Sequence, residues 1–225
     1  MRSTRTKAKR GPGRPKDIKK ISERKEDILK CASKLFAFQG YQNTDVQEIA
    51  DQLGVAKGTI YHYFSSKEKL FLAAVDRGME EMSDFINQSV AKIEDPIKKI
   101  AKAIHSYLTF FDKHPHLIEL IVQERAEFRD RKKPTYILHR EKNIKPWNEL
   151  FQNLSQSGRL RELNSDRTTE TISNLLYGTI FTTYYHHQGR SFESRTSEVL
   201  MLIFQGILSD HERVNIDEYI HVQVS

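Results

Sequence analysis

The sequence predicts an all-α protein in two parts, an N-terminal unit of three helices and a larger helical domain. Apolar residues recur three or four positions apart from about residue 22 onward, which is the period of an amphipathic helix. No segment alternates apolar and polar residues as a half-buried strand does, and no Asn-Gly pair marks a hairpin. The length of 225 residues fits one large domain or two modest ones, and 38% hydrophobic residues suffice for a core.

The first 20 residues differ from the rest of the chain in charge and composition. Residues 1–25 contain eleven Lys or Arg and two Asp or Glu, whereas the remaining 200 residues contain 25 and 28. A basic tail on a near-neutral body is typical of a protein that binds a polyanion, although a solvated tail without a partner has the same composition. Residues 1–20 hold almost no large apolar side chains, so we expect a disordered basic arm there.

Three helices are expected after the arm, of which the second and third are short. The first runs to Gly40, which has the position of a helix-terminating glycine. A capping box of Thr44 and Gln47 opens the second helix, and Gly54 ends it. A third short helix follows over residues 57–64, with apolar residues four positions apart.

A long helix is expected to join this unit to the rest of the chain, because Ser65 and Glu68 form another capping box and a helical apolar pattern follows. We therefore place the three-helix unit at residues 21–66 and a helical domain at residues 67–225. Proline and glycine positions predict the later helices, which start after Asp95, restart at Pro115, and cover residues 134–157 (interrupted near Pro146), 167–188 and 194–208.

Residues 44–67 carry the most informative pattern, TDVQEIADQLGVAKGTIYHYFSSK. Two short helices share a tight turn at Gly54, which allows a backbone conformation closed to most residues. The outer face of the second of these helices carries no acidic residue, and it consists of Lys57, Gly58, Thr59, Tyr61, His62 and Tyr63. Such a face suits a recognition helix in the major groove of DNA, and an ordinary helical hairpin with a solvated face is the alternative.

The spacing of these residues resembles the tetracycline-repressor (TetR) family of bacterial transcriptional regulators. The resemblance covers about residues 22–82 and is carried by Tyr41, Thr44, Ile49, Ala50, Gly54, Val55, Gly58, Tyr61, Phe64, Lys67 and Leu70. It implies an all-α homodimer with an N-terminal helix-turn-helix domain and a C-terminal domain that senses a ligand and dimerises. Ala56 departs from the pattern, because many members have a Ser or Thr there that caps the recognition helix. Beyond residue 82 only the helical layout and Tyr177-Gly178 resemble the family.

Three further residues are expected to contact DNA outside the recognition helix. Thr44 and Lys67 stand at the starts of helices, where backbone amides and the helix dipole favour a phosphate. Arg14 lies in Gly11–Lys16, which resembles the Gly-Arg-Pro core of arms that bind the minor groove of A·T-rich DNA. A plain flexible linker is the alternative, since Pro12-Gly13 replaces the expected Arg-Gly.

The last two strong helices are expected to form a homodimer. Every residue of Val199–Phe204 is apolar, so this helix needs cover on both sides. The resemblance implies a four-helix interface between two subunits, for which we expect Leu176, Ile180, Thr183, Val199, Ile203 and Ile207. A two-fold dimer reads a palindromic operator in double-stranded DNA.

A ligand pocket is expected inside the C-terminal domain, lined by aromatic residues that include Tyr107, Phe111, Trp147, Tyr177 and Phe181. Packing alone could also explain each of these side chains. The resemblance implies a repressor released by a small ligand, which we expect to be lipophilic or aromatic with modest charge. A C-terminal domain that responds to a protein partner instead is the alternative.

Several other classes of function have no support in the sequence. It shows no catalytic motif, no phosphate-binding glycine loop and no cofactor signature, so we do not expect an enzyme. His114, His116, His186 and His187 lack the spacing of metal ligands on one helix face, and the single Cys31 cannot form an internal disulfide. The longest apolar runs have six residues and no secretory signal is expected, so we expect no membrane contact. The resemblance implies a cytoplasmic, nucleoid-associated bacterial protein.

Overall fold

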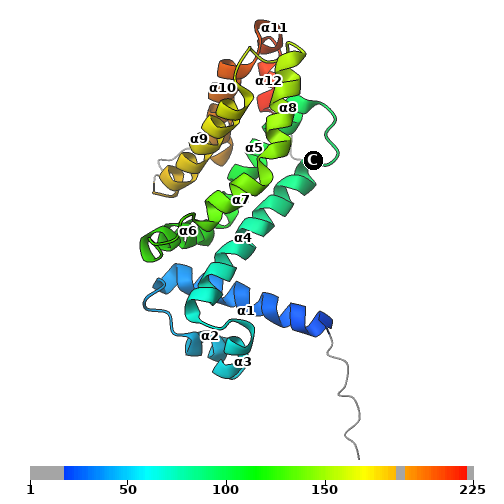
Figure 1. Ribbon diagram of the computed structural model, residues 1–225. Helices are drawn as coiled ribbons and strands as arrows, with labels where there is room; N and C mark the ends of the chain where they lie inside the picture. Colours follow the sequence, from blue (N-terminus) through cyan, green and yellow to red (C-terminus); the bar gives the residue numbers. More distant parts are fainter. Residues whose placement is uncertain (1–17, 186–190, 222–225) are drawn as a thin grey trace, which may run out of the picture.

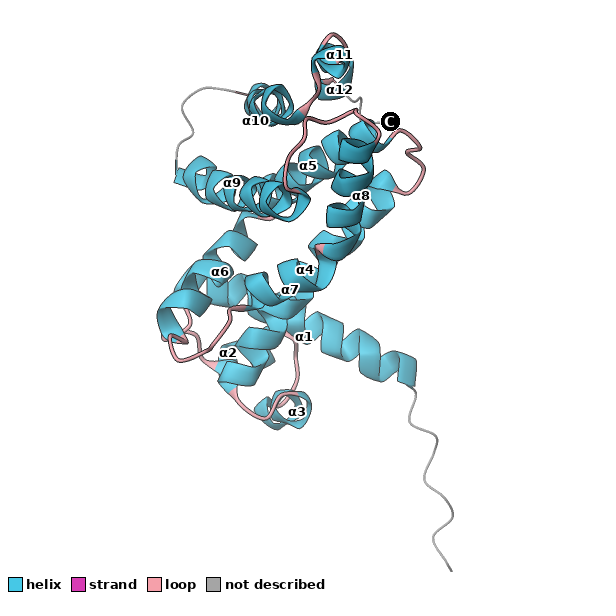
Figure 2. Cartoon of the chain, turned by 45° about the horizontal axis from the view of Figure 1, so that its top comes forward, coloured by secondary structure: helices cyan, strands magenta, loops and turns pink. Residues whose placement is uncertain are grey.

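The computed structural model describes residues 18–185 and 191–221 and confirms the all-α prediction. Within these ranges the chain forms twelve helices and no strand (Figures 1 and 2). A lone antiparallel bridge joins Leu160 to Leu208. None of the described helices is both long and apolar enough to cross a membrane.

The N-terminal unit consists of α1 (Ile18–Gln39), α2 (Val46–Gln52) and α3 (Lys57–Tyr63), at the lower end of Figure 1. α1 begins three residues before the end of the predicted disordered arm, and residues 1–17 of that arm lie outside the described residues. Gly40 and Gly54 both have positive φ, +85° and +62°, as their predicted roles in ending α1 and α2 require.

Both predicted capping boxes are displaced by one residue. Asp45, not Thr44, is the N-cap of α2, and its carboxylate accepts a hydrogen bond from the Gln47 backbone N–H at 2.8 Å. Thr44 is unavailable because its hydroxyl donates to the Gly40 carbonyl at 2.8 Å. Ser66 rather than Ser65 caps the following helix, by accepting from the backbone N–H of Lys69.

The long helix α4 (Lys67–Val90) runs from the N-terminal unit through the middle of the molecule (Figure 1). Near its start, Phe71 packs edge-on against Phe36 of α1, with ring centroids 5.1 Å apart. At Gly78, α4 crosses the sixth helix so closely that a Cβ would stand 2.5 Å from the Cδ2 of Leu117. α4 therefore contributes side chains both to the core of the N-terminal unit and to the core of the helices that follow it.

The remaining helices form the part of the molecule above the N-terminal unit (Figures 1 and 2). They are α5 (Pro96–Lys113), α6 (Pro115–Glu127), α7 (Thr135–Asn143), α8 (Lys145–Gln156), α9 (Ser165–Tyr185), α10 (Phe192–Ile207), α11 (Asp210–Arg213) and α12 (Ile216–Ile220). Asp95 caps α5 as its position before Pro96 predicts. Two helices, α7 and α8, cover residues 134–157, as the interruption expected near Pro146 predicts, and the chain bends between them at Ile144.

Candidate nucleic-acid interface and ligand cavity

The outer face of α3 presents the six side chains or backbone positions expected for a recognition helix. Ile60 is the one residue of this helix that is buried, and it anchors α3 on the core. The other six positions, which are Lys57, Gly58, Thr59, Tyr61, His62 and Tyr63, are exposed or half-exposed. Ala56 occupies the N-cap position in an extended conformation and makes no side-chain cap hydrogen bond. α3 therefore offers an uncapped N-terminus and a face with no carboxylate of its own.

Lys57 is paired with an acidic residue that the sequence pattern did not indicate. Its ammonium donates a hydrogen bond to the carboxylate of Asp45 at 2.8 Å, and both side chains are exposed. This bond raises the pKa of Lys57. The pKa of Asp45 is lowered by the hydrogen bond from the Gln47 backbone and by that from Lys57. The surface around α3 thus includes one negative charge, contributed by the cap of α2.

The two residues predicted to hold phosphates differ in their surroundings. Thr44 is only 1% exposed and its hydroxyl donates to the Gly40 carbonyl, so its side chain is not available to a phosphate in this conformation. Lys67 is the first residue of α4, and its ammonium donates to the Gln42 carbonyl at 3.0 Å and lies 4.8 Å from the ring centroid of Tyr41. Burial lowers the pKa of Lys67. The third residue, Arg14, lies outside the described residues.

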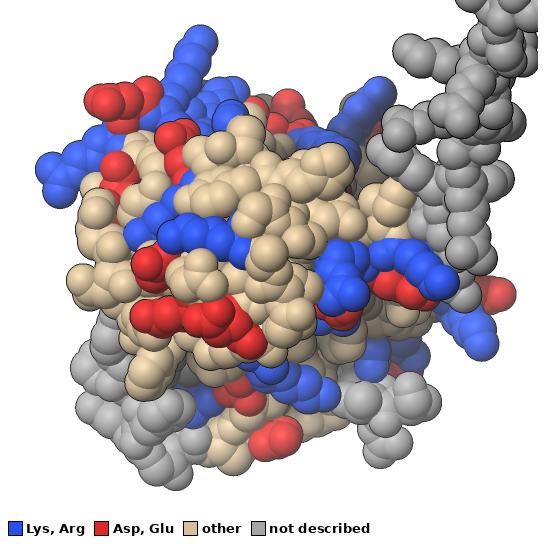
Figure 3. Space-filling view, turned by 90° about the horizontal axis from the view of Figure 1, so that it is seen from below, with Lys and Arg blue, Asp and Glu red and all other residues tan. Residues whose placement is uncertain are grey.

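The charges on the lower side of the molecule are mixed. Figure 3 shows blue Lys and Arg side chains interspersed with red Asp and Glu side chains around an uncharged area, without a continuous positive stripe among the described residues it displays. The sequence places seven Lys or Arg and one Asp in residues 1–17. Much of the net positive charge of the sequence therefore belongs to residues 1–17, which lie outside the described residues.

A cavity of about 510 Å³ lies among α4, α5, α7, α8 and α9. Its size is within the range of roughly 300–1,000 Å³ that small-molecule sites occupy. Tyr107 and Trp147 line it, as predicted. Phe111 instead lines a separate cavity of about 390 Å³ between α5, α6, α9 and α10.

Tyr177 and Phe181, also expected in the pocket, do not line the larger cavity. The ring of Tyr177 packs against Tyr136 and Phe181, with centroids 4.4 and 4.6 Å away. These two residues support the cavity wall from behind, because Tyr136 itself lines the cavity. Gly178, next to Tyr177, is exposed, and a Cβ there would meet nothing within 4 Å.

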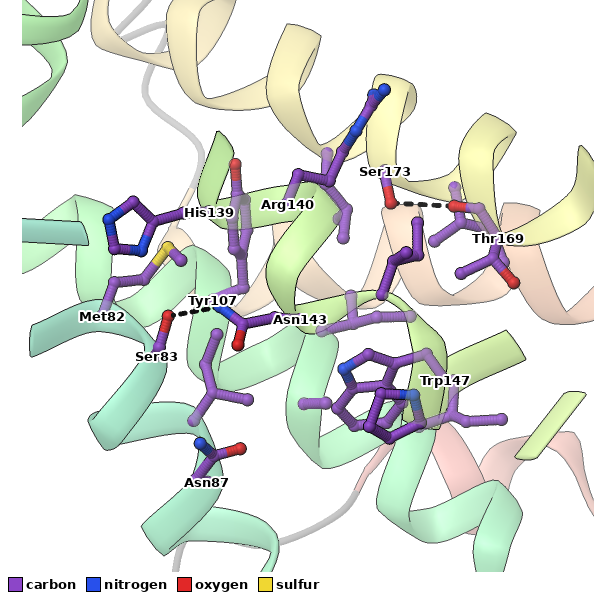
Figure 4. Close-up of a pocket in the computed structure, with 18 of the residues that line it drawn as sticks. Met82, Ser83, Asn87, Tyr107, His139, Arg140, Asn143, Trp147, Thr169 and Ser173 are labelled. Atoms are coloured by element: carbon purple, nitrogen blue, oxygen red, sulfur yellow. Dashed lines mark hydrogen bonds between the residues drawn. The ribbon is translucent and has the colours of Figure 1, made fainter. Parts of the chain in front are cut away.

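Polar groups from α7 face the cavity and hold α4 (Figure 4). The Asn143 amide donates to the Ser83 hydroxyl at 3.2 Å, and the Nε2 of the buried His139 lies 2.7 Å from a carboxylate oxygen of Asp76. Ser83 and Asp76 both belong to α4. Sequence reasoning missed these residues, because nothing in the pattern of α7 shows that α4 lies opposite it.

Two tyrosines complete the polar side of the cavity. The hydroxyls of Tyr107 and Tyr136 are 3.2 Å apart and share a hydrogen bond. Burial raises the pKa of Tyr136 to about 12 and that of Tyr107 well above its ordinary value, so both phenols keep their protons at neutral pH. Among the described residues, no cluster of His, Cys, Asp or Glu could hold a metal ion.

Most of the residues expected in the dimer interface face the interior of their own chain. Leu176, Ile180, Ile203 and Ile207 are all buried inside the chain itself, Val199 is half-buried, and the side chain of Thr183 lies outside the described residues. The outer face instead carries Leu175 and Leu202, which are 41% and 69% exposed. Gly178 of α9 and Gly206 of α10 are exposed as well. An uncovered apolar face is therefore present on these helices, formed by residues other than those expected.

Comparison with known proteins gives matches over the N-terminal region and over the whole fold. Residues 28–74 match the family described as bacterial regulatory proteins, tetR family. The transcriptional activator FasR of Mycolicibacterium smegmatis is 30% identical over 115 residues, which are 51% of this chain and 50% of FasR. The uncharacterized regulator YerO of Bacillus subtilis is 33% identical over 46% of this chain and 37% of YerO. The matched region thus spans half or less of these two relatives.

Solved structures share the fold at lower sequence identity. A putative transcriptional regulator from Saccharomonospora viridis, in complex with choline, has a TM-score of 0.71 at 21% identity, covering 84% of this chain and 99% of that one. FadR from Bacillus subtilis, in complex with stearoyl-CoA, has a TM-score of 0.69 at 21% identity, covering 80% and 98%. Both likenesses extend from the N-terminal unit into the helices that enclose the cavity.

Proposed function

The chain belongs to the tetR family of bacterial regulatory proteins, and on this premise we propose that it is a DNA-binding transcriptional regulator controlled by a small molecule. We assign DNA binding to residues 21–66, assisted by the arm, and regulation and dimerisation to residues 67–225. The observation that carries the proposal is the exposed face of α3. This face presents hydrogen-bond donors and a glycine, has no carboxylate of its own, and lies within the segment that matches the family. No enzymatic activity is part of the proposal.

The exposed side of α3 enters the major groove in this proposal. Thr59, Tyr61, His62 and Tyr63 reach base edges, and Gly58 lets the backbone approach. Lys57 exchanges Asp45 for a phosphate on binding, which the exposure of their ion pair permits. Lys67 and the N-terminus of α4 hold a second phosphate. Arg14 of the arm enters the minor groove, where the potential is most negative.

A homodimer forms through the outer face of α9 and α10. Leu175 and Leu202 leave this face apolar, and the exposed glycines Gly178 and Gly206 allow close helix approach. A two-fold dimer places its two α3 helices roughly 34–36 Å apart, which fits a palindromic operator with half-sites one turn of DNA apart.

The regulator is a repressor that a ligand in the 510 Å³ cavity releases from DNA. The effect of the ligand reaches the DNA-binding helix through α4, because α4 begins beside α3 and lines the cavity with Met79, Met82 and Ser83. A ligand that changes the Asn143–Ser83 and His139–Asp76 contacts acts on α4 directly. Only a ligand with different affinities for the two arrangements shifts the equilibrium between them.

The DNA-binding part is tested by selecting bound DNA from a random pool with the full chain, then measuring affinity against salt. Tyr63→Ala is expected to alter sequence preference. Lys67→Ala is expected to weaken binding to all sequences alike and to lower the salt slope by about one. Lys92→Ala, exposed beyond the far end of α4, is the control and should change neither. Removal of residues 1–17 should lower affinity at low salt and leave the selected site unchanged.

The ligand-release part is tested separately, by adding compounds to the complex of protein and selected DNA. Release accompanied by a rise in thermal stability supports a small-molecule sensor. If no compound releases the DNA while a protein from the same organism does, the C-terminal domain serves a protein partner. An unchanged salt slope for Lys67→Ala would refute its phosphate contact.

A further inference from the structure

We infer that the cavity takes an anionic amphiphile, a molecule with a long apolar body and a carboxylate or similar head group held by Arg140 and the neighbouring face of α7. The inference rests on the proposed function, because it names the class of ligand for the same cavity. It also gives a sign and a position to the modest charge that the sequence analysis allows the lipophilic ligand. Three features of the cavity wall carry it, namely its charge, the donor groups on α7 and the apolar side opposite them.

The charged side chains that line the cavity are all positive. Lys99 of α5 and Arg140 and Lys142 of α7 belong to its wall, and no Asp or Glu is among the described residues that do. None of these three cations forms an ion pair with a carboxylate in the described part of the chain, and Arg140 donates only to the neutral amide oxygen of Asn174, at 2.9 Å. The cavity therefore has a positive potential that an anion would neutralise.

The lysines just outside the cavity are different. Lys98, one position from Lys99, pairs with Glu218 of α12. Lys133, before α7, pairs with Glu141 at 2.7 Å. The charges of these two lysines are thus compensated by carboxylates, whereas the three cations of the cavity wall have no carboxylate partner among the described residues.

One face of α7 offers hydrogen-bond donors at helical spacing. Tyr136, Arg140 and Asn143 are four and three positions apart, so they stand one above another on the same side of the helix. Figure 4 shows Arg140 extending from α7 toward α9, and Asn143 reaching to Ser83 of α4. The hydroxyls of Tyr107 and Tyr136 carry two protons, and the bond between them uses one. The other proton is available to an acceptor such as a carboxylate oxygen.

The opposite side of the cavity is apolar and accepts the body of the ligand. Its wall consists of side chains from α4, α5 and α8, among them Met82, Ile86, Ile104, Leu150 and Phe151. The thioether of Met82 adapts to chains of different shape. A cationic ligand would find no carboxylate here, and a neutral one would leave the positive charges without a partner. An alkyl chain that ends in an anion satisfies both sides.

The test compares decanoate, decanol and decyltrimethylammonium, which share an alkyl chain and differ in charge. Each is titrated into the full-length protein below its micelle concentration, with calorimetry and thermal unfolding as readouts. We expect decanoate to bind at least about tenfold tighter than decanol and to raise the melting temperature, and the ammonium to bind most weakly. Equal or tighter binding of decanol or the ammonium overturns the inference, and so does the absence of binding by all three.

Two variants separate the role of Arg140 from a general change in the protein. Arg140→Gln removes the charge on α7 and is expected to weaken decanoate binding by about tenfold while leaving decanol unchanged. Lys145→Gln is the control, because Lys145 begins α8 next to α7 but does not line the cavity. Equal loss for decanoate and decanol in Arg140→Gln overturns the placement of the head group.

DNA release in the same samples keeps this inference apart from the proposed function. Decanoate that binds and releases the DNA supports both. Decanoate that binds without releasing DNA supports the ligand class and overturns the release mechanism. Decanol or the ammonium releasing DNA, with decanoate inactive, overturns the ligand class and leaves the proposed function in place.

Discussion

Replacing Leu202 by glutamate is expected to separate the two subunits without unfolding either one. Leu202 lies on the outer face of α10, where 69% of its surface is exposed, whereas its neighbour Ile203 is 5% exposed and faces the core of its own chain. Substitutions at these two adjacent positions therefore distinguish the proposed dimer interface, at Leu202, from the core of the subunit, at Ile203. Leu202→Glu should leave the folded subunit intact, and Ile203→Glu should destabilise it.

The size of the effect follows from the exposed surface. Full burial of a leucine side chain is worth about 1.5–3 kcal/mol. With 69% of Leu202 available for burial, each copy contributes about 1–2 kcal/mol, and two-fold symmetry doubles this to about 2–4 kcal/mol per dimer. Loss of that energy weakens dimerisation roughly 30- to 700-fold, and the cost of desolvating two carboxylates adds to it.

Sedimentation at several protein concentrations measures the dimer constant, and circular dichroism on heating measures the fold. Leu202→Glu should sediment as a monomer at concentrations where the unchanged chain is dimeric, and its helix content should stay the same. Val214→Glu, at a highly exposed position between α11 and α12, is the matched control and should remain dimeric. A dimer constant unaffected by Leu202→Glu would refute the assignment of this face.

Three further outcomes are expected from local features. Asp45→Asn keeps a side chain that caps α2 but removes the charge that holds Lys57, so DNA affinity at low salt should rise about two- to fivefold; a fall in affinity would contradict the view of Asp45 as a competitor of phosphate. Ala56→Ser supplies the missing cap of α3 and should stabilise the N-terminal unit by about 0.5–2 kcal/mol in thermal unfolding. The hydrogen bond from Arg159 lowers the pKa of Glu212, so its stabilisation is present above the ordinary glutamate pKa and is lost as the pH falls through the lowered value. Arg159→Met should accordingly reduce the loss of stability on acidification. A melting temperature that falls equally with acidification in both proteins would count against this pairing.

The elements that the sequence predicted well depend on local interactions. Gly40, Gly54 and Asp95 act within a few residues of their own position, so their roles could be inferred without knowing the fold. The caps of α2 and α4 were misplaced by one residue, since Thr44-Asp45 and Ser65-Ser66 each offer two adjacent capping side chains. The choice between them depends on tertiary contacts such as the bond from Thr44 to Gly40.

The sides of α10 and the walls of the cavity could not be predicted in the same way. Val199–Phe204 is apolar all round, so its sequence does not distinguish the side that meets α5 from the side that meets solvent. The donors on α7 have a helical spacing that was readable, but their partners on α4 come from some 60 residues earlier in the chain. Only packing brings Ser83 and Asn143 together.

The crossing of α4 and α6 at Gly78 determines how far a small tilt is transmitted. α4 rises about 1.5 Å per residue, so Lys67 stands about 16 Å along the axis from this point of closest approach. A rotation of α4 by about 5° about Gly78 would move its N-terminal end by roughly 1.4 Å, a displacement comparable to half the length of a hydrogen bond. Since Gly78 has no side chain, the side chain of Leu117 rests directly on the backbone of α4 and fixes the point about which α4 can tilt. The part of α4 between Gly78 and α3 is therefore long, whereas only a few residues separate Gly78 from Met79, Met82 and Ser83 at the near end of the cavity. A small shift beside the cavity thus becomes a larger shift at the start of α4.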